Sequence, residues 1–137
     1  MSASVNHLQE LRLLERNPGH GHPLRPEYRL TPVGRAVAVW AAELDSLLIT
    51  PADNVLYRGK WALPVVSGLD PVQRYSEIKR ALPALTDRAL SICLTRLVDC
   101  QWVKRQVDSQ SLPPAVSYHT LNKGAVVHEH LQLLPQW

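Results

Sequence analysis

One stretch of the 137-residue sequence places cationic and hydroxyl side chains at the spacing of a helix face. Between residues 87 and 99 the apolar residues recur at helical spacing, and Thr86 followed by Asp87 is a typical helix start. The expected buried face holds Ala89, Leu90, Cys93, Leu94 and Leu97, and the expected outward face holds Arg88, Ser91, Ile92, Thr95 and Arg96. Because guanidinium and hydroxyl groups bind phosphates and base edges, this face is a candidate nucleic-acid contact.

Two pairs of cations flank this helix in the sequence. Lys79 and Arg80 lie in the short amphipathic segment before it, and Lys104 and Arg105 lie in a strand candidate after it. We expect these four side chains to hold a phosphate backbone. The formal net charge of +3 and the pI of about 9.1 are compatible with a nucleic-acid partner, but they are too small to predict one alone.

The remaining reactive residue types do not form a recognisable site. No serine-hydrolase, phosphate-loop, dinucleotide or zinc-protease motif occurs, so enzyme activity has no motif support, and we predict no catalytic residue, cofactor or metal. Cys93 and Cys100 are too far apart on a helix for a disulfide, and we expect reduced thiols, with Cys93 in the core. The pairs His20/His22 and His128/His130 are interpreted as solvated histidines.

Composition limits the class of protein. Hydrophobic residues make up 45% and charged residues 20% of the chain, which predicts a packed protein rather than a disordered one. The amino terminus is polar, and no apolar run approaches the roughly 20 residues of a membrane span. We therefore expect a cytoplasmic protein with no membrane contact.

The second part of the chain has the element order of a known DNA-binding architecture. Val55 to Leu69 predicts two short helical pieces, "GLDPVQ" a turn, and "RYSEIKRAL" a helix. After helix 87–99, "QWVKRQV" and "AVSYHTL" predict a hairpin over 102–121, followed by a helix over 124–134. Helix, tight connection, helix and hairpin is the order of a winged helix-turn-helix.

The first part of the chain has fewer elements. Leucines at 8, 11, 13 and 14 suit a helix end followed by a strand, "PGHGHPLRP" is a turn cluster, and "EYRLT" alternates like a strand. A helix is expected over 34–49. The predicted fold class is mainly α with small β-hairpins (α+β), with a domain over 1–49 and a second over 50–137.

Several motifs of the second domain resemble the HxlR family of winged-helix regulators, relatives of the MarR group. They are "GKW" at 59–61, "RYSEIKRALPAL" at 74–85, "LTRLVDCQWVKR" at 94–105, and then Pro113, Pro114, Tyr118 and Gly124. The resemblance runs from about residue 50 to the carboxyl terminus. It implies a DNA-binding transcriptional regulator with helix 87–99 in the major groove and hairpin 102–121 as the wing.

The resemblance also implies partners. Such proteins usually act as two-fold dimers on palindromic sites, so we expect a homodimer on double-stranded DNA, with helix 34–49 and the last helix as contact elements. The resemblance also allows for a small-molecule effector. Many family members have a sensing cysteine before "GKW", but this chain has Thr50 and Pro51 there, so thiol sensing of that type is not expected.

The first domain is similar to the end of the second. "LQELRLLERN" at 8–17 matches "LVDCQWVKRQ" at 97–106, and "RPEYRLTPVG" at 25–34 matches "AVSYHTLNKG" at 115–124. We interpret the chain as a truncated tandem duplication, in which a partial winged-helix repeat, wing plus helix, precedes a complete copy. The helix pair that would read DNA is missing from the first copy.

Departures from the family pattern support an alternative. The complete copy has Ala115 and Ser117 where such wings usually carry a basic residue, whereas the first copy keeps Arg25, Glu27, Leu30 and Thr31. The alternative is a degenerate winged-helix protein that no longer binds DNA. It would bind a small molecule or a protein, or catalyse a reaction in a pocket between its two halves. Salt-dependent binding to random duplex DNA distinguishes the two hypotheses.

Overall fold

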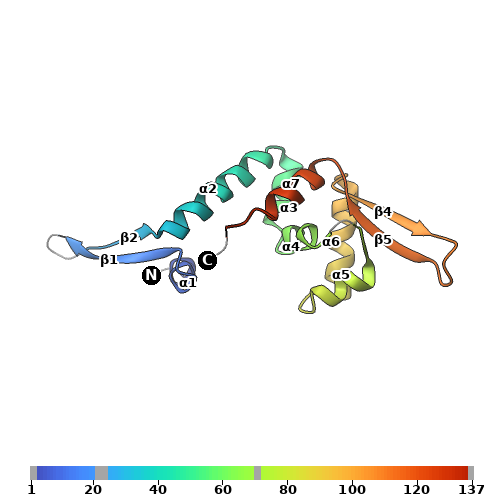
Figure 1. Ribbon diagram of the computed structural model, residues 1–137, viewed down its shortest axis with the longest axis horizontal. Helices are drawn as coiled ribbons and strands as arrows, with labels where there is room; N and C mark the ends of the chain where they lie inside the picture. Colours follow the sequence, from blue (N-terminus) through green and yellow to red (C-terminus); the bar gives the residue numbers. More distant parts are fainter. Residues whose placement is uncertain (1–2, 21–24, 70–71, 136–137) are drawn as a thin grey trace. The chain divides into compact units, whose positions relative to one another are not determined.

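The computed structural model describes residues 3–20, 25–69 and 72–135 (Figure 1). The chain divides into two compact units, one of Met1–Asp45 with Leu134–Trp137, and one of Ser46–Leu133. Helices predominate, with small antiparallel sheets. Within the described ranges, no helix has the length and apolar character needed to cross a membrane.

The first unit is built from a helix, a hairpin and a longer helix. They are α1 (Ala3–Glu10), β1 (Leu14–His20), β2 (Arg25–Leu30) and α2 (Pro32–Leu47). β1 pairs with β2 from Leu14↔Leu30 to His20↔Arg25, with an irregularity between Asn17 and His20. The predicted turn is therefore too long at both ends, because residues 18–20 belong to β1 and residues 25–26 belong to β2. The centre of that turn, residues 21–24 with His22, lies outside the described residues.

The described residues of the second unit form five helices and a three-stranded sheet. The helices are α3 (Pro51–Arg58), α4 (Ala62–Ser67), α5 (Tyr75–Ala81), α6 (Asp87–Asp99) and α7 (Lys123–Leu131). Its core is mostly aliphatic, with Val65, Val66, Leu69, Leu90, Leu97 and Val127 fully buried. The helix expected over 124–134 is three residues shorter at its end, because Gln132 caps it through bonds to the carbonyls of His128 and Glu129.

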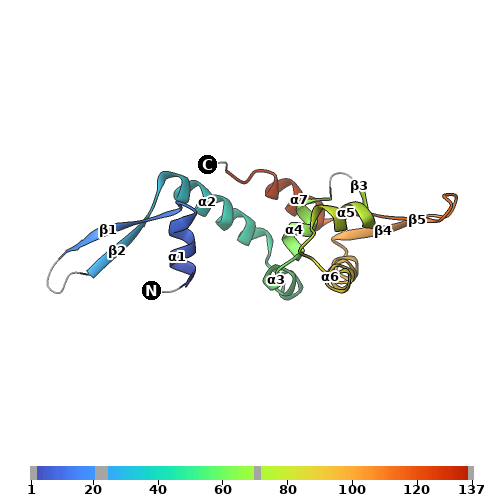
Figure 2. The ribbon, with the colours of Figure 1, turned by 90° about the horizontal axis from the view of Figure 1, so that it is seen from below.

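The sheet of the second unit contains a strand that the sequence did not predict. β3 (Val72–Arg74) pairs with β5 (Ala115–Thr120), which also pairs with β4 (Val103–Asp108), so the order is β3-β5-β4. The predicted turn "GLDPVQ" is thus wrong at Val72 and Gln73, while residues 70–71 lie outside the described residues. Figures 1 and 2 both show the β4–β5 hairpin extending away from the helices of its unit.

The junction between α6 and the hairpin is tight. Gln101 has a φ of 61°, which turns the chain so that the Trp102 carbonyl accepts a bond from Leu121 N at 2.8 Å. Gly124, at the start of α7, closes this junction, because a Cβ there would lie 2.0 Å from the Trp102 oxygen. Helix, hairpin and last helix are therefore held together by backbone contacts that only glycine permits.

One partly buried ion pair joins the beginnings of two helices in the second unit. Lys123 Nζ lies 2.6 Å from Asp53 Oδ2, and Asp53 is 4% exposed. Asp53 also completes a capping box with Thr50 at the start of α3. Burial opposes the charge on Asp53, but hydrogen bonds from Lys123 and Thr50 outweigh it and keep the pKa of the carboxyl below its usual value.

Two expectations about single side chains change. His128 is not simply solvated, since its Nδ1 lies 2.9 Å from the Val66 carbonyl oxygen. Both cysteines are free, as predicted, but Cys93 is half-buried rather than fully buried. Burial raises the pKa of the Cys93 thiol to about 11, so this thiol is protonated at neutral pH.

Candidate nucleic-acid interface

The outward face of α6 is exposed as the sequence predicts. Arg88, Ser91, Ile92, Thr95 and Arg96 are all exposed, while Leu90, Leu94 and Leu97 are buried against the rest of the second unit. α6 begins at Asp87, because the Thr86 hydroxyl accepts a hydrogen bond from Ala89 N at 3.1 Å. The predicted helix and its predicted cap are confirmed.

The turn that joins α5 to α6 is held by a buried leucine and a lysine. Leu85 is 1% exposed, and its N–H bonds back to the Leu82 carbonyl at 3.0 Å. The Lys79 ammonium donates to the Leu85 carbonyl oxygen and is half-buried. Lys79 therefore holds the turn, whereas its neighbour Arg80 is exposed and available to a ligand.

Tyr75 contributes a contact that the sequence reasoning missed. Its hydroxyl lies 3.2 Å from the Asp87 carbonyl oxygen, to which it donates, and 3.4 Å from Ser91 Oγ. The first residue of α5 is thus tied to the first turns of α6, which fixes the angle between the two helices. No local sequence pattern pairs a tyrosine at position 75 with residues 87 and 91.

The hydroxyl groups on α6 have different hydrogen-bonding capacities. Thr95 Oγ1 donates to the Ser91 carbonyl oxygen at 2.8 Å, one helical turn back. Its proton is therefore used inside the helix, and the oxygen remains as an acceptor. Thr95 can accept a bond from a base amino group, but it cannot donate to a phosphate without breaking this bond.

Strand pairing separates the two cations of the hairpin. Arg105 pairs with Tyr118 and Lys104 with His119, and neighbouring strand residues point to opposite faces of a sheet. Arg105 and Tyr118 line a hollow of about 280 Å³ together with Ser91, Thr95 and Asp99 of α6. Arg105 therefore lies on the α6 side of the sheet, and Lys104 lies on the other side.

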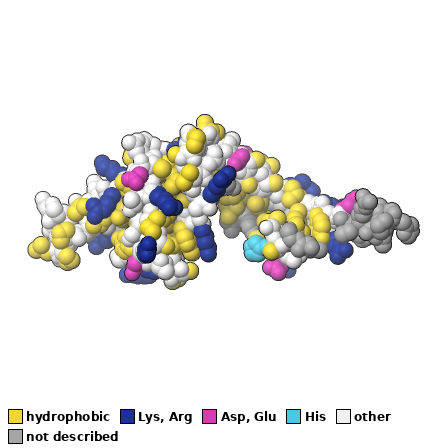
Figure 3. All heavy atoms as spheres, turned by 180° about the vertical axis from the view of Figure 1, so that it is seen from behind, with side chains coloured by type: hydrophobic (Ala, Val, Ile, Leu, Met, Phe, Trp, Pro, Cys, Tyr) yellow, Lys and Arg dark blue, Asp and Glu magenta, His cyan; other side chains and the backbone are white. Residues whose placement is uncertain are grey.

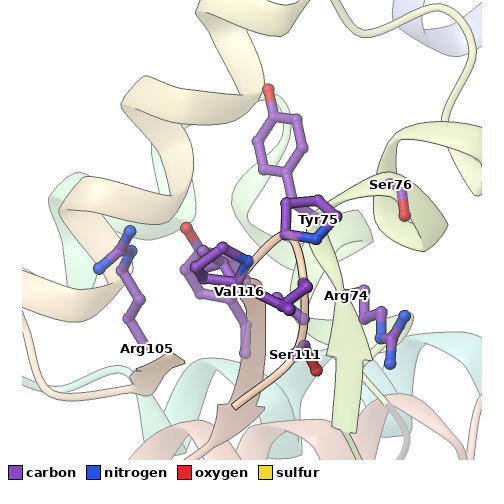
Figure 4. Close-up of a pocket in the computed structure, with 11 residues that line it drawn as sticks. Arg74, Tyr75, Ser76, Arg105, Ser111 and Val116 are labelled. Carbon is purple, nitrogen blue, oxygen red and sulfur yellow. The ribbon is translucent and has the colours of Figure 1, made fainter. Parts of the chain in front are cut away.

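A larger hollow lies beside the loop end of the hairpin, next to the first turn of α5. It measures about 770 Å³ and is lined by Arg74, Ser76, Arg105, Ser111 and Pro113, among others. Figure 4 shows Arg105 and Arg74 on opposite sides of this hollow, with Val116 between them. The sequence reasoning did not select Arg74 or Ser76, because nothing in a linear pattern brings them near residue 105.

Positive charge is concentrated in the second unit. Residues 46–133 contain ten Lys or Arg and seven Asp or Glu, which accounts for the whole net charge of +3. On the face shown in Figure 3, Lys and Arg side chains lie scattered among apolar and uncharged ones rather than in one basic patch. The charge is therefore suited to several separate phosphate contacts.

The arrangement defines a class: a capped, exposed helix after a tight turn, followed by a hairpin, is a winged helix-turn-helix protein. A family model described as HxlR-like helix-turn-helix matches residues 56–137. The chain belongs to this family, and it is an HxlR-type, DNA-binding transcriptional regulator, as the motifs in the sequence predict.

Similar proteins agree with this assignment. A Fusobacterium mortiferum regulatory protein, MalR, is 34% identical over 82 residues, which cover 58% of this chain and 76% of the relative. An HTH-type transcriptional regulator of Methanothermobacter thermautotrophicus is 36% identical over 80 residues, covering 58% of this chain and 60% of that one. A solved MarR-family regulator from Enterococcus faecalis has a TM-score of 0.54 at 26% identity, covering 69% of this chain and 80% of that chain.

Proposed function

We propose that α6 binds in the major groove of double-stranded DNA and that the β4–β5 hairpin contacts the flanking backbone as a wing. The observation that carries this proposal is the exposed face of α6. Neither Arg88 nor Arg96 forms an ion pair within the described part of the chain, so both guanidinium groups are available to DNA. Ser91, Ile92 and Thr95 lie on the same face, between the two arginines.

Each side chain has a proposed role. Arg88 and Arg96 bind guanine edges or phosphates, Ser91 and Thr95 bind base edges, and Ile92 contacts a thymine methyl group. Arg80 and Arg105 bind the phosphate backbone. Lys79 and Lys104, expected among the backbone contacts, are left out of the proposed DNA contacts, because Lys79 holds the turn and Lys104 lies across the sheet from α6.

A salt titration tests this proposal. Binding to random duplex DNA should occur at low salt and weaken steeply as salt rises, and Arg88→Ala or Arg96→Ala should each reduce the slope of log K against log salt by about 1. For the wing, Arg105→Gln should behave like the α6 variants, whereas Lys104→Gln removes the same charge from the other face and should leave the slope unchanged. Absence of binding by the wild type at low salt would refute the proposal.

A homodimer is part of the same proposal. One reading helix per chain can contact one half-site, so a two-fold dimer is needed for a palindromic operator. α2 and α7 are the proposed contact elements, and exposed apolar side chains on them support this: Val39 is 61% exposed and Val126 49%. Analytical ultracentrifugation should show a dimer, and Val39→Asp should shift it toward monomer. A cytoplasmic location follows from a role on DNA.

We also propose that the first unit is a truncated copy of the end of the second. The observation that supports it is a shared junction: Arg12 and Gln101 both have a φ of 61°. The Leu13 N–H bonds to the Leu8 carbonyl as Trp102 bonds to Leu97, both at 3.0 Å. Gly34 faces Leu13 as Gly124 faces Trp102, with a Cβ 2.0 Å from the carbonyl oxygen in each case.

Equivalent residues are 89 positions apart before the hairpin, as Arg12 and Gln101 are, and 90 positions apart after it, as Gly34 and Gly124 are. The two hairpins therefore differ by a single residue in length. The proposed boundary at 49/50 is supported by the start of α3, which Thr50 caps, and it lies four residues after the division between the two compact units at Asp45 and Ser46. If the units are equivalent, Gly34→Ala should disrupt the first unit as Gly124→Ala disrupts the second. Hydrogen exchange can measure this by comparing amide protection in β1 and β2. Unchanged protection would contradict the equivalence.

A further inference from the structure

The loop between β4 and β5 carries an apolar side chain, at the end of the hairpin that extends from the helices of its unit (Figures 1 and 2). Leu112 is 94% exposed, more than any other large hydrophobic residue in the described ranges. The loop has no cation, because the sequence contains no lysine or arginine from residue 106 to residue 122. The loop therefore cannot make charge-assisted contacts with phosphates, and it offers a partner an apolar surface instead.

Hydrogen bonds and prolines hold this loop in one shape. Asp108 accepts a bond from Ser111 Oγ at 2.8 Å and another from Gln110 N at 3.1 Å. These bonds hold the pKa of the Asp108 carboxyl below its usual value, so the group that orders the loop is charged at neutral pH. The two prolines at 113–114 restrict the backbone on the other side of the loop. Because the loop is already ordered, a partner that covers it removes little conformational entropy.

A continuous surface connects Leu112 to α6. Arg105 and Tyr118 line the smaller hollow beside the outward face of α6. The same two side chains line the larger hollow, whose wall on the loop side includes Leu112. Since the two hollows share a wall, the apolar loop continues the surface that is proposed to face DNA.

The length of the hairpin indicates which part of a duplex the loop meets. A strand rises about 3.3 Å per residue, so β4 ends at Asp108, about 10 Å beyond Arg105. With α6 in the major groove and Arg105 on a phosphate at its edge, the minor groove lies on the far side of that phosphate. The minor groove of B-DNA is about 6 Å wide, which admits a side chain. We propose that Leu112 enters this groove as an apolar wedge and partly unstacks one base step.

The wedge adds a specificity determinant to the proposed function, on which it rests, because Arg105 must hold the phosphate between the two grooves. Selectivity follows from the cost of deforming the duplex. Pyrimidine–purine steps such as TA unstack easily, whereas A-tracts are stiff. Leu112 therefore selects flexible steps at positions that α6 does not contact.

Salt dependence distinguishes an apolar wedge from a phosphate contact. Leu112→Ser should weaken binding to random duplex DNA about tenfold, because the burial of the leucine is lost, and should leave the slope of log K against log salt unchanged. Arg105→Gln should instead reduce that slope by about 1. Leu112→Met keeps the apolar volume and should bind within about threefold of the wild type. All three positions of the test are exposed or partly exposed, and Leu112→Ser should melt with the wild type.

Two duplexes of about 30 base pairs, roughly three helical turns, separate step flexibility from composition. One alternates T and A and has a flexible step at every second position, and the other is an A-tract of the same charge and base composition. Fluorescence anisotropy at constant salt gives the affinity of each. The preference for the alternating duplex should be about fivefold larger in the wild type than in Leu112→Ser. α6 contacts both duplexes in both proteins, so this comparison cancels its contribution.

Three results would overturn the proposal: an unchanged affinity in Leu112→Ser, a reduced salt slope in that variant, or the same preference between the two duplexes in both proteins. If the wild type binds no duplex at low salt, the proposed function and the wedge are both refuted. If Arg88→Ala and Arg105→Gln lower the salt slope while Leu112→Ser matches the wild type, only the wedge is refuted. The two failures can therefore be told apart.

Discussion

Replacement of Gly124 by alanine should destabilise the second unit strongly, although alanine is normally the better helix residue. The new Cβ would lie 2.0 Å from the Trp102 oxygen and 2.7 Å from its carbonyl carbon, so the backbone must retreat by about 1 Å. Overpacking of this kind costs about 1–3 kcal/mol, and the Leu121–Trp102 hydrogen bond contributes about 1 kcal/mol more. The higher helix propensity of alanine offsets about 1 kcal/mol of this cost, so the free energy of unfolding should fall by about 2 kcal/mol in total.

For a unit of this size, such a loss lowers the melting temperature by about 8–16 °C. Calorimetry of wild type, Gly124→Ala and Gly68→Ala measures it. Gly68 is the matched control, because it has a φ of −84° and its nearest foreign atom, Val65 O, would be 3.6 Å from a Cβ. Gly68→Ala should be close to neutral. The reasoning is refuted if the two variants melt together, since the short contact would then not exist in solution.

The other predictions concern the helix termini and the α5–α6 contact. Lys123→Met leaves the Asp53 carboxylate without its partner and should cost about 2 kcal/mol at pH 7 in urea unfolding. Because the folded pKa of Asp53 is lowered, this difference should be present above pH 4 or so and disappear as pH falls and the carboxylate protonates. Thr86→Ala removes the cap of α6 and should cost about 1 kcal/mol in the same assay. Tyr75→Phe should change stability by less than about 1 kcal/mol but weaken DNA binding, measured by fluorescence anisotropy; unchanged binding would contradict a positioning role.

The helix-turn-helix part of the fold was predictable from the sequence because its signals are local. α6 lies where helical periodicity and the Thr86 cap place it, and its outward residues are the ones expected. Turn, cap and apolar face all depend on residues within a few positions of one another. Short-range patterns of this kind are present in a single sequence.

The features that were missed depend on distant partners or on side-chain direction. β3 has three residues, too few for a visible alternation, and exists because Val72 pairs with His119, far along the chain. The bond from Lys79 to the Leu85 carbonyl depends on a rotamer that no pattern specifies. The separation of Lys104 from Arg105 is different, because alternation along a predicted strand already implies that neighbours face opposite sides.

The proposed duplication implies that the first unit is a winged helix that lacks its helix pair. Leu8 and Leu97 occupy equivalent places before the two junctions, yet Leu8 is 37% exposed and Leu97 fully buried. In the second unit α4 and α5 supply buried residues such as Val66 and Ile78 to the core around α6, and the described part of the first unit has no counterpart of either helix. The first unit is also neutral in formal charge, with five basic and five acidic residues. Because both the proposed reading helix and the excess positive charge belong to residues 46–133, removing charge from the first unit should change DNA affinity far less than removing Arg88 or Arg96.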